Sequence, residues 1–384
     1  MKLKLPSPES FTSRLRGPEV AARVGVWLGI CFGVAFVTGL ISHAGQDTPG
    51  WLTFPTRPVS LYRITQGLHV ISGTAAVPLL LVKLWSVYPR LFGRLALRER
   101  RQLMVQLAER GSIAVLVATA IFQLATGLAN SAQWYAWSFS FRDTHYAVAW
   151  VAIGSLLVHI AVKLPVIRTA LTGPLDDAEP VGEPSEGQLS RRQLLRATWL
   201  ATGVAVLATA GASVPALRKV SIFAVRSGDG PQGVPINRSA EAAQVTNTMV
   251  QPSYRLEIRH GDRRMSLSRA DLEAMSQTSA SLPIACVEGW SASATWSGVR
   301  VRELLALVDA PTDADVKVES LERSGTFAVT ELPSHFAQDD LTLLALELNG
   351  ETLNLDHGYP CRIIAPARPG VLQTKWVKRL TVLA

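Results

Sequence analysis

The sequence predicts an all-α transmembrane helix bundle, made of four spans plus a fifth anchoring span, followed by an α+β domain. Long apolar runs with few charges occupy the chain up to about residue 220. From about Val234 the pattern changes to short alternating runs separated by Gly, Pro, Asp and Asn. A chain of 384 residues is long enough for two or three domains, each with its own core.

Five segments have the length and apolarity of a membrane-spanning helix, which needs about 20 residues to cross the hydrocarbon core. They are residues 21–41, 61–85, 111–129, 146–167 and 198–217. We assign residues 1–170 to a membrane domain that contains the first four spans. The fifth span, residues 198–217, would anchor the C-terminal domain.

The distribution of Lys and Arg predicts the direction of these spans. The N-terminal tail contains Lys2, Lys4, Arg14 and Arg16, and the loop after the second span is dense in Arg. Short cytoplasmic loops carry an excess of positive residues. We therefore expect a multi-pass protein of the plasma membrane, with a cytoplasmic N-terminus and an extracytoplasmic C-terminal domain. The net charge of +8 lies beside apolar runs, so we expect no nucleic-acid binding.

Three histidines lie in or at the edge of the predicted spans: His69 in the second, His145 at the start of the fourth and His159 in the inner half of the fourth. The last two are fourteen positions apart, which places them about 21 Å apart and nearly on one face of a helix. Ionisable groups in lipid are costly, and neutral imidazole is a natural ligand of haem iron. A histidine hydrogen-bonded across helices is the alternative for any one of them. Together they favour haem b.

The stretches "LYRITQGLHVISG" and "HYAVAWVAIGSLLVHIAVKLP" resemble the b-type cytochrome subunits of membrane formate dehydrogenases and nickel-iron hydrogenases. The resemblance covers about residues 20–170, and the histidine spacing is its specific part. It implies that His69 and His145 bind an outer haem and that the quinone pool is the electron partner. The family's inner haem needs a histidine at the cytoplasmic end of the first span, where this sequence has none. His159 therefore has no assigned partner, unless it pairs with His69.

Residues 171–197 read as a cytoplasmic linker, rich in Pro, Gly and acidic residues, that ends in a twin-arginine-like motif. The motif, Ser190-Arg-Arg-Gln-Leu-Leu-Arg196, precedes the fifth apolar run. It resembles a twin-arginine export signal, a route that exports folded domains with their cofactors. A positive flank for a membrane helix is an equally good interpretation.

Residues 234–384 form the predicted α+β domain. Strand patterns occur in "YRLEIRHG", "DRRMSLS", "VKVESLE", "TFAVTEL", "LTLLALELNG" and "CRIIAP". Helices are expected at "SRADLEAMS" and "VRVRELLALV".

Cys286 lies in "IACVEGWS", and the chain has only two other cysteines, Cys31 and Cys361. It could be a small core residue, or it could form a disulfide with Cys361 outside the cell. It could also be a thiolate ligand of a metal whose other donors come from a cofactor. The residues alone leave these alternatives open.

The stretch from Cys286 to "RELLALV", together with the stretch from "DDLTLLALELNG" to "KRLTVL", resembles the molybdopterin domain of the sulfite oxidase superfamily. The periplasmic methionine sulfoxide reductase catalytic subunit is the branch that it resembles most. The resemblance implies Mo-molybdopterin as cofactor and Cys286 as the catalytic thiolate on molybdenum. It also implies cofactor contacts at Asn237, Ala240, Glu241, Ser320, His357, Arg362, Gln373, Thr374 and Lys375. Arg and Lys suit the phosphate of the pterin, and amide or imidazole groups suit its rings.

Sulfite-oxidising members of the superfamily have Arg residues soon after the Cys, whereas "VEGWSASATWSG" has none. We therefore expect oxygen-atom transfer to or from a small neutral molecule, such as a sulfoxide or N-oxide, coupled through haem b to the quinone pool. A cofactor-free, membrane-tethered binding module and a sulfite-type dehydrogenase are the alternatives. The sequence implies no oligomer.

Overall fold

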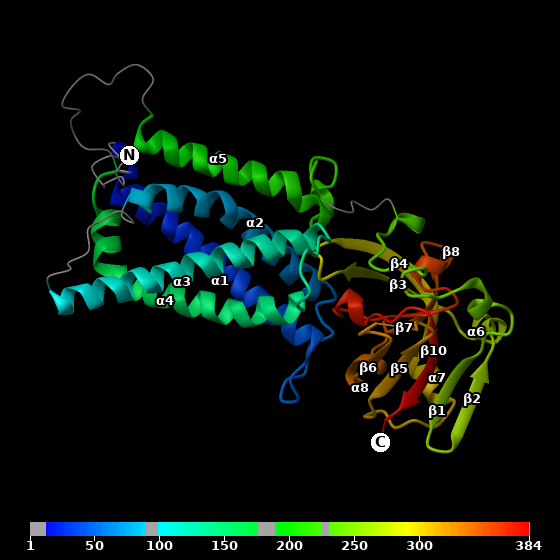
Figure 1. Ribbon diagram of the computed structural model, residues 1–384. Coiled ribbons are helices and arrows are strands. Elements are labelled where there is room, and N and C mark those ends of the chain that lie inside the picture. The colour runs from blue at the N-terminus through cyan, green and yellow to red at the C-terminus, as the bar shows by residue number, and fades with distance from the viewer. Residues whose placement is uncertain (1–12, 90–98, 176–188, 225–229, 324, 384) are drawn as a thin grey trace. The chain divides into compact units, whose positions relative to one another are not determined.

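The computed structural model describes residues 13–89, 99–175, 189–224, 230–323 and 325–383 (Figure 1). The chain divides into two compact units. The first comprises Met1–Gly39, Leu68–Ala210 and Val220–Phe223, and the second comprises Leu40–Gly67, Gly211–Lys219 and Ala224–Ala384. Two short segments that adjoin the apolar helices therefore belong to the same unit as the C-terminal sheets.

Five helices in these described ranges are long and apolar enough to cross a membrane. They are α1 (Pro18–Gln46), α2 (Leu61–Val87), α3 (Arg100–Ser131), α4 (Phe141–Thr172) and α5 (Arg191–Thr209). Most of them are longer than the predicted spans because their ends include polar residues with good helix propensity. Helix α5 begins earlier and ends earlier than the predicted fifth span. Pro215 is poorly compatible with a helix interior, and the chain forms two short 3₁₀ turns between Ala210 and Leu217.

The start of α5 is fixed by the residues of the twin-arginine-like motif. The hydroxyl of Ser190 accepts a hydrogen bond from the backbone of Gln193, whose side chain accepts from the backbone of Ser190. This reciprocal pair satisfies two backbone donors that a helix N-terminus otherwise leaves free. Arg191 forms an ion pair with Glu19 of α1 at 3.4 Å. The linker segment 176–188 lies outside the described residues.

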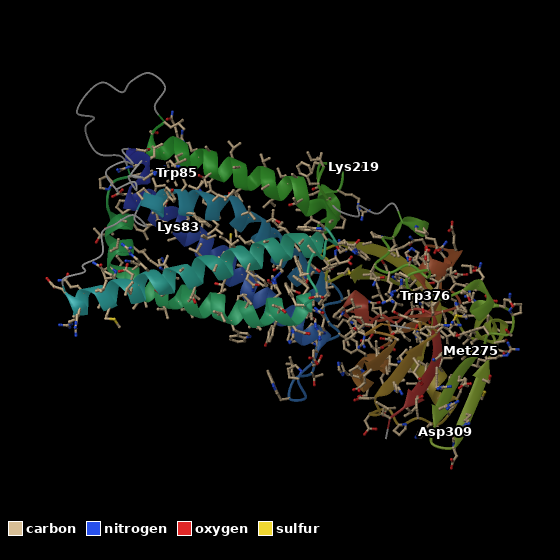
Figure 2. All side chains as sticks on the ribbon, viewed as in Figure 1. Lys83, Trp85, Lys219, Met275, Asp309 and Trp376 are labelled. Atoms are coloured by element: carbon tan, nitrogen blue, oxygen red, sulfur yellow. The ribbon has the colours of Figure 1, made fainter. Side chains whose placement is uncertain are left out.

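The other contacts of the first unit combine apolar packing with a few polar bonds between helices. Val20, Val24 and Leu79 form a buried cluster, against which Leu194 and Leu195 pack. Lys83, labelled in Figure 2, donates from Nζ to the carbonyl of Ala21 at 2.7 Å. Helices α3 and α4 are also joined by the ion pair between Glu109 and Lys163.

The second unit contains two five-stranded sheets in its described part. One has the order β2-β1-β10-β5-β6, and the other has the order β3-β4-β7-β8 with β9 paired to β7. The strands are β1 (Leu256–His260), β2 (Arg263–Leu267), β3 (Thr278–Ala285), β4 (Ser291–Arg300), β5 (Val316–Ser320), β6 (Val329–Leu332), β7 (Leu343–Leu348), β8 (Glu351–Thr352), β9 (Arg362–Ile364) and β10 (Val377–Val382). Short helices α6 (Arg269–Ala274), α7 (Val301–Ala306) and α8 (Ser334–Ala337) connect them. A helical region followed by a mixed α and β domain is thus confirmed.

The core of the second unit includes a side chain from the loop between α1 and α2. Phe54 is 4% exposed and belongs to the large buried cluster that also contains Leu256 and Leu380. Its carbonyl lies 2.9 Å from Nε2 of His335. Arg57 of the same loop makes two hydrogen bonds to the carboxylate of Asp339, at 2.8 and 3.1 Å. This loop is therefore part of the packed structure around the sheets.

Candidate functional site

Cys286 lies at the turn of the hairpin formed by β3 and β4. These strands pair in register from Thr278 with Gly298 to Ala285 with Ser291. The backbone of Cys286 donates to the carbonyl of Trp290 at 2.9 Å, and its own carbonyl accepts from Gly289 at 3.0 Å. Gly289 has a φ of 89°, in the region that favours glycine. The turn thus holds the buried Cys286 at one backbone position.

Side chains from distant parts of the second unit bind the outer carbonyls of this turn. Gln66 donates from Nε2 to the carbonyl of Val287 at 3.2 Å, and the Ser213 hydroxyl donates to the carbonyl of Gly289. The hydroxyl of Ser291 in turn donates to the carbonyl of Ser213 at 3.0 Å. Sequence reasoning missed Gln66 and Ser213, because bonds between residues this far apart leave no local pattern.

The structure shows no disulfide between Cys286 and Cys361, and neither is bonded to Cys31. The disulfide alternative is therefore wrong. Cys361 is fully buried, with its sulfur 3.1 Å from the hydroxyl of Tyr254. Burial raises the pKa of the Cys361 thiol to about 12, so this thiol stays protonated. Cys361 is a structural residue of the core.

Three cationic side chains, Arg362, Arg368 and Lys375, are buried in the C-terminal domain at 3%, 4% and 9% exposure. Burial lowers the pKa of Arg362 to about 9, of Arg368 to about 10 and of Lys375 to about 7. None of the three makes an ion pair with a described carboxylate. Buried charges are normally paired, because desolvation penalises the charged form. A bound anion would offset the buried positive charge of this cluster.

The hydrogen bonds of Arg362 leave one donor unused. Its two terminal nitrogens donate to the carbonyls of His357, at 3.1 Å, and Gln373, at 3.2 Å. Its Nε is buried and has no partner among the described residues. Lys375 donates from Nζ to the carbonyls of Arg238 and Asp356, the latter at 2.9 Å, and this nitrogen lies 4.4 Å from the ring centroid of Trp376.

Gly358 permits the close packing of this cluster. Its φ is 110°, and a Cβ there would lie 3.0 Å from Cβ of Lys375 and 3.1 Å from Cβ of Arg362. The preceding His357 is buried, with Nε2 at 2.7 Å from the carbonyl of Pro231. Burial and the guanidinium of Arg362 lower the pKa of His357 to about 4. The imidazole is thus neutral at pH 7, and Nε2 donates while Nδ1 is left as an acceptor.

Three of the predicted contact residues use their side chains within the protein. The hydroxyl of Ser320 donates to the carbonyl of Lys375 at 2.7 Å. Gln373 donates from Nε2 to the carbonyl of Arg368 at 3.0 Å, and the hydroxyl of Thr374 lies 2.7 Å from that of Thr330. These bonds shape the backbone around the buried cations.

The remaining predicted contacts, in the segment 237–241, differ in their exposure. Asn237 accepts from the backbone of Arg238 at 2.9 Å, and the backbone of Ala240 donates to the carboxylate of Asp356 at 2.7 Å. Glu241 is exposed. The structure therefore links Ala240, through Asp356, to the segment that contains His357, whereas the Glu241 side chain lies at the surface.

In the first unit, the structure brings His69 of α2 and His145 of α4 together. Their ring centroids are 6.3 Å apart. Nδ1 of His69 lies 2.8 Å from the carbonyl of Ala35, and Nδ1 of His145 lies 3.1 Å from the hydroxyl of Thr126. Both rings thus use Nδ1 within the protein, and Nε2 remains as the nitrogen that can bind a metal. His159 is about 21 Å further along α4.

Comparisons with known proteins give one family match and several relatives. Residues 242–384 match the family described as oxidoreductase molybdopterin binding domain. The chain is 32% identical to sulfite oxidase of Arabidopsis thaliana over 114 residues, which cover 25% of this chain and 29% of that protein. It is 35% identical to mitochondrial sulfite oxidase of Homo sapiens over 101 residues, 24% of this chain and 18% of that protein.

A protein of Azospira oryzae, named as a protein-methionine-sulfoxide reductase subunit, YedZ1, is 32% identical over 112 residues. These cover 29% of this chain and 42% of that protein. The chain thus spans less than half the length of each of these relatives. Residues 242–384 thus match an oxidoreductase domain that binds molybdopterin, and part of the chain is similar to sulfite oxidases.

Proposed function

We propose that this protein is a membrane-anchored, molybdopterin-dependent oxidoreductase that transfers an oxygen atom outside the membrane and exchanges electrons with the quinone pool through haem b. The observation that carries the proposal is the buried cationic cluster of Arg362, Arg368 and Lys375. It lies in the segment that matches the molybdopterin-binding family and has no ion-pair partner among the described carboxylates.

The residues present fit an anionic pterin cofactor. A phosphate can accept hydrogen bonds from guanidinium and ammonium groups, and the unpartnered Nε of Arg362 is a donor of this kind. An anion beside the cluster would also relieve the cost of burying three positive charges. In this proposal Arg362, Arg368 and Lys375 hold the cofactor, and the sulfur of Cys286 is the protein ligand of molybdenum. When bound, the cofactor supplies two-electron oxygen-atom transfer.

The protein's own residues would fix the orientation of this site. Neutral His357 presents Nδ1 as an acceptor to ring N–H groups. Lys375 lies close enough to Cys286 for the charges of the two groups to interact. Gln66 and Ser213 hold the turn on which Cys286 lies.

The residues that come after Cys286 favour a neutral substrate. Between Val287 and Val299 the chain has Ser, Thr, Ala and Trp residues but no Arg or Lys. Sulfoxides and N-oxides are neutral oxygen donors, and their reduction consumes two electrons and two protons and releases water. We therefore propose a sulfoxide or N-oxide as substrate. The similarity to sulfite oxidases makes a sulfite-type dehydrogenase the second candidate.

The geometry of His69 and His145 supports the haem. Metal bonds to imidazole nitrogen are about 2 Å long, so two imidazoles that hold one iron would need ring centroids within roughly 6 Å of each other. The observed separation is 6.3 Å. The hydrogen bonds at both Nδ1 atoms would orient the rings and fix their tautomer, as is usual for metal-bound histidine. We propose one haem at this pair and no ligand role for His159.

The five apolar helices support a membrane location. With the Arg-rich segments on the cytoplasmic side, the domain after α5 would lie outside the plasma membrane. Export by the twin-arginine route would deliver this domain folded, with its cofactor. The joining of both halves in one chain would keep the two redox centres at a high effective concentration.

Metal and haem analysis of the purified protein, beside the variant Cys286→Ser, tests this function. We expect molybdenum and haem in the wild type, and turnover of sulfoxides or N-oxides that the variant loses while it keeps haem. Cys361→Ser is the matched control and should keep turnover. Normal turnover in Cys286→Ser would refute the ligand role, and rapid turnover of sulfite alone would favour the second candidate. A protein without molybdenum would point to a binding module.

A further inference from the structure

Oε1 of Gln123 and Nε1 of Trp137 are among the buried polar atoms of the first unit that have no hydrogen-bond partner among the described residues. Gln123 lies on α3 and is 9% exposed. Its Nε2 donates to the carbonyl of His145 at 2.9 Å, which fixes the orientation of the amide. Oε1 is thus an acceptor that lacks a donor, and Nε1 of Trp137 is a donor that lacks an acceptor. Buried polar atoms normally have a hydrogen-bond partner, so a ligand or a water is expected beside these two.

Aromatic rings connect these two residues. Trp137, in the loop between α3 and α4, stacks on Phe139 with a centroid distance of 5.2 Å and an angle of 5°. Phe139 lies 6.0 Å from Phe122, which precedes Gln123 on α3. Rings at such distances attract one another and can take a further flat ring by stacking. This aromatic group reaches the surface of the first unit, because Phe139 is 40% exposed and Ile121, next to Phe122, is 49% exposed.

The same region contains the proposed haem ligand. Gln123 bonds the backbone of His145 directly, and the ring of His145 lies 4.9 Å from that of Phe141. A ligand that takes a hydrogen bond from Trp137 and gives one to Gln123 would therefore lie close to this haem. It must be flat, apolar over most of its surface and polar at its oxygen atoms.

We propose that Gln123, Trp137, Phe122 and Phe139 form a binding site for the ring of a 1,4-hydroquinone. A hydroquinone hydroxyl donates to Oε1 of Gln123, and a ring oxygen accepts from Nε1 of Trp137. An anion would be repelled by the amide oxygen, and an acyl chain would satisfy neither atom. A water would satisfy them without using the aromatic rings. The inference rests on the proposed haem at His69 and His145 and assigns the site from which it is reduced.

The oxidation of the hydroquinone at this site is balanced if the haem accepts its electrons. One hydroquinone becomes one quinone and releases two electrons and two protons. A haem held by His69 and His145 would accept these electrons one at a time, and the two protons would be released to water.

The test uses the full-length protein in lipid nanodiscs and the variants Trp137→Phe and Gln123→Leu. The first removes the indole donor and keeps an aromatic ring, and the second removes the acceptor. Trp134→Phe is the matched control, because Trp134 is in the same loop and is 65% exposed. Binding is measured by the fluorescence quenching of 2-heptyl-4-hydroxyquinoline N-oxide, and by its displacement with decylubiquinol. Haem content and the spectrum reduced by dithionite report the integrity of each variant.

We expect the wild type and Trp134→Phe to bind the probe equally. Trp137→Phe and Gln123→Leu should each bind it about 3- to 10-fold more weakly, as the loss of one neutral hydrogen bond predicts. Haem reduction by decylubiquinol should slow in both, while dithionite still reduces the haem. Unchanged binding in both variants, or no binding to the wild type, would overturn the site. A wild type that binds the probe but contains no haem would refute the haem proposal alone.

Discussion

The buried ammonium of Lys375 predicts how the stability of the cofactor-free protein depends on pH. Burial lowers the pKa of this group from 10.5 to about 7 in the fold, and a lysine in the unfolded chain has a pKa of about 10.4. Between these values the unfolded chain binds more protons than the folded protein. The free energy of unfolding therefore falls as the pH is lowered from about 10 to about 7, and it levels off below that.

The magnitude can be worked from the two pKa values. At about 1.36 kcal/mol per pH unit, the full loss is about 4 to 5 kcal/mol, of which about 3 kcal/mol falls between pH 9.5 and pH 6. Lys375→Met removes the titrating group and keeps a flexible side chain of similar length. We expect the contribution of this residue to the pH dependence to disappear in the variant, whatever its absolute stability.

The assay is urea unfolding of cofactor-free, full-length protein in detergent, measured by tryptophan fluorescence at both pH values. Lys378→Met is the control, since Lys378 is only half-buried and lies three positions away. The wild type and this control should each lose about 3 kcal/mol more than Lys375→Met on going to pH 6. Cofactor should reduce the loss, because an anion beside the ammonium raises its pKa again. Equal pH dependence of all three proteins would refute the reasoning.

Three further substitutions separate structural from functional residues. Gly358→Ala should destabilise the protein by about 1 to 3 kcal/mol and weaken cofactor retention, because the φ is positive and the new Cβ meets Lys375. Thermal unfolding measures the stability, and molybdenum analysis measures the retained cofactor. Cys361→Ala should lose about 1 to 2 kcal/mol through a cavity beside Tyr254 but keep turnover, and loss of turnover at unchanged molybdenum content would contradict this. His159→Phe should keep the absorption bands of reduced haem, and their disappearance would assign His159 as a ligand.

Apolar length was sufficient to predict the five long helices, and alternation was sufficient for strands such as β1 and β5. The strand patterns cited from the sequence omitted β3, β4 ("SASATWSGVR"), β8 and β10. Strand β4 consists largely of Ser and Ala, which have low intrinsic strand preference. Its structure depends on pairing with β3 on one side and β7 on the other, and a local pattern does not contain that information.

The residues of the candidate site, too, could be predicted from the sequence only in part. The cysteine and the cationic residues could be found from motifs, because each is required by the chemistry of a ligand. The donors to the Cys286 turn, Gln66 and Ser213, could not, since they act through backbone carbonyls more than 70 positions away. Gln123 and Trp137 are ordinary helix and loop residues in the sequence. They are distinguished only in the structure, where each has a buried polar atom without a hydrogen-bond partner among the described residues.

The position of Phe54 in the core of the second unit determines which fragments of this protein can be expected to fold. A fragment that begins at Ala224 would contain both sheets but would lack the ring that fills their shared interior, the arginine that pairs with Asp339 and the amide that holds Val287. Such a fragment would expose apolar surface and free the turn on which Cys286 lies. A soluble version for crystallisation or for transplantation onto another anchor should therefore retain residues 40–67, fused or supplied as a peptide.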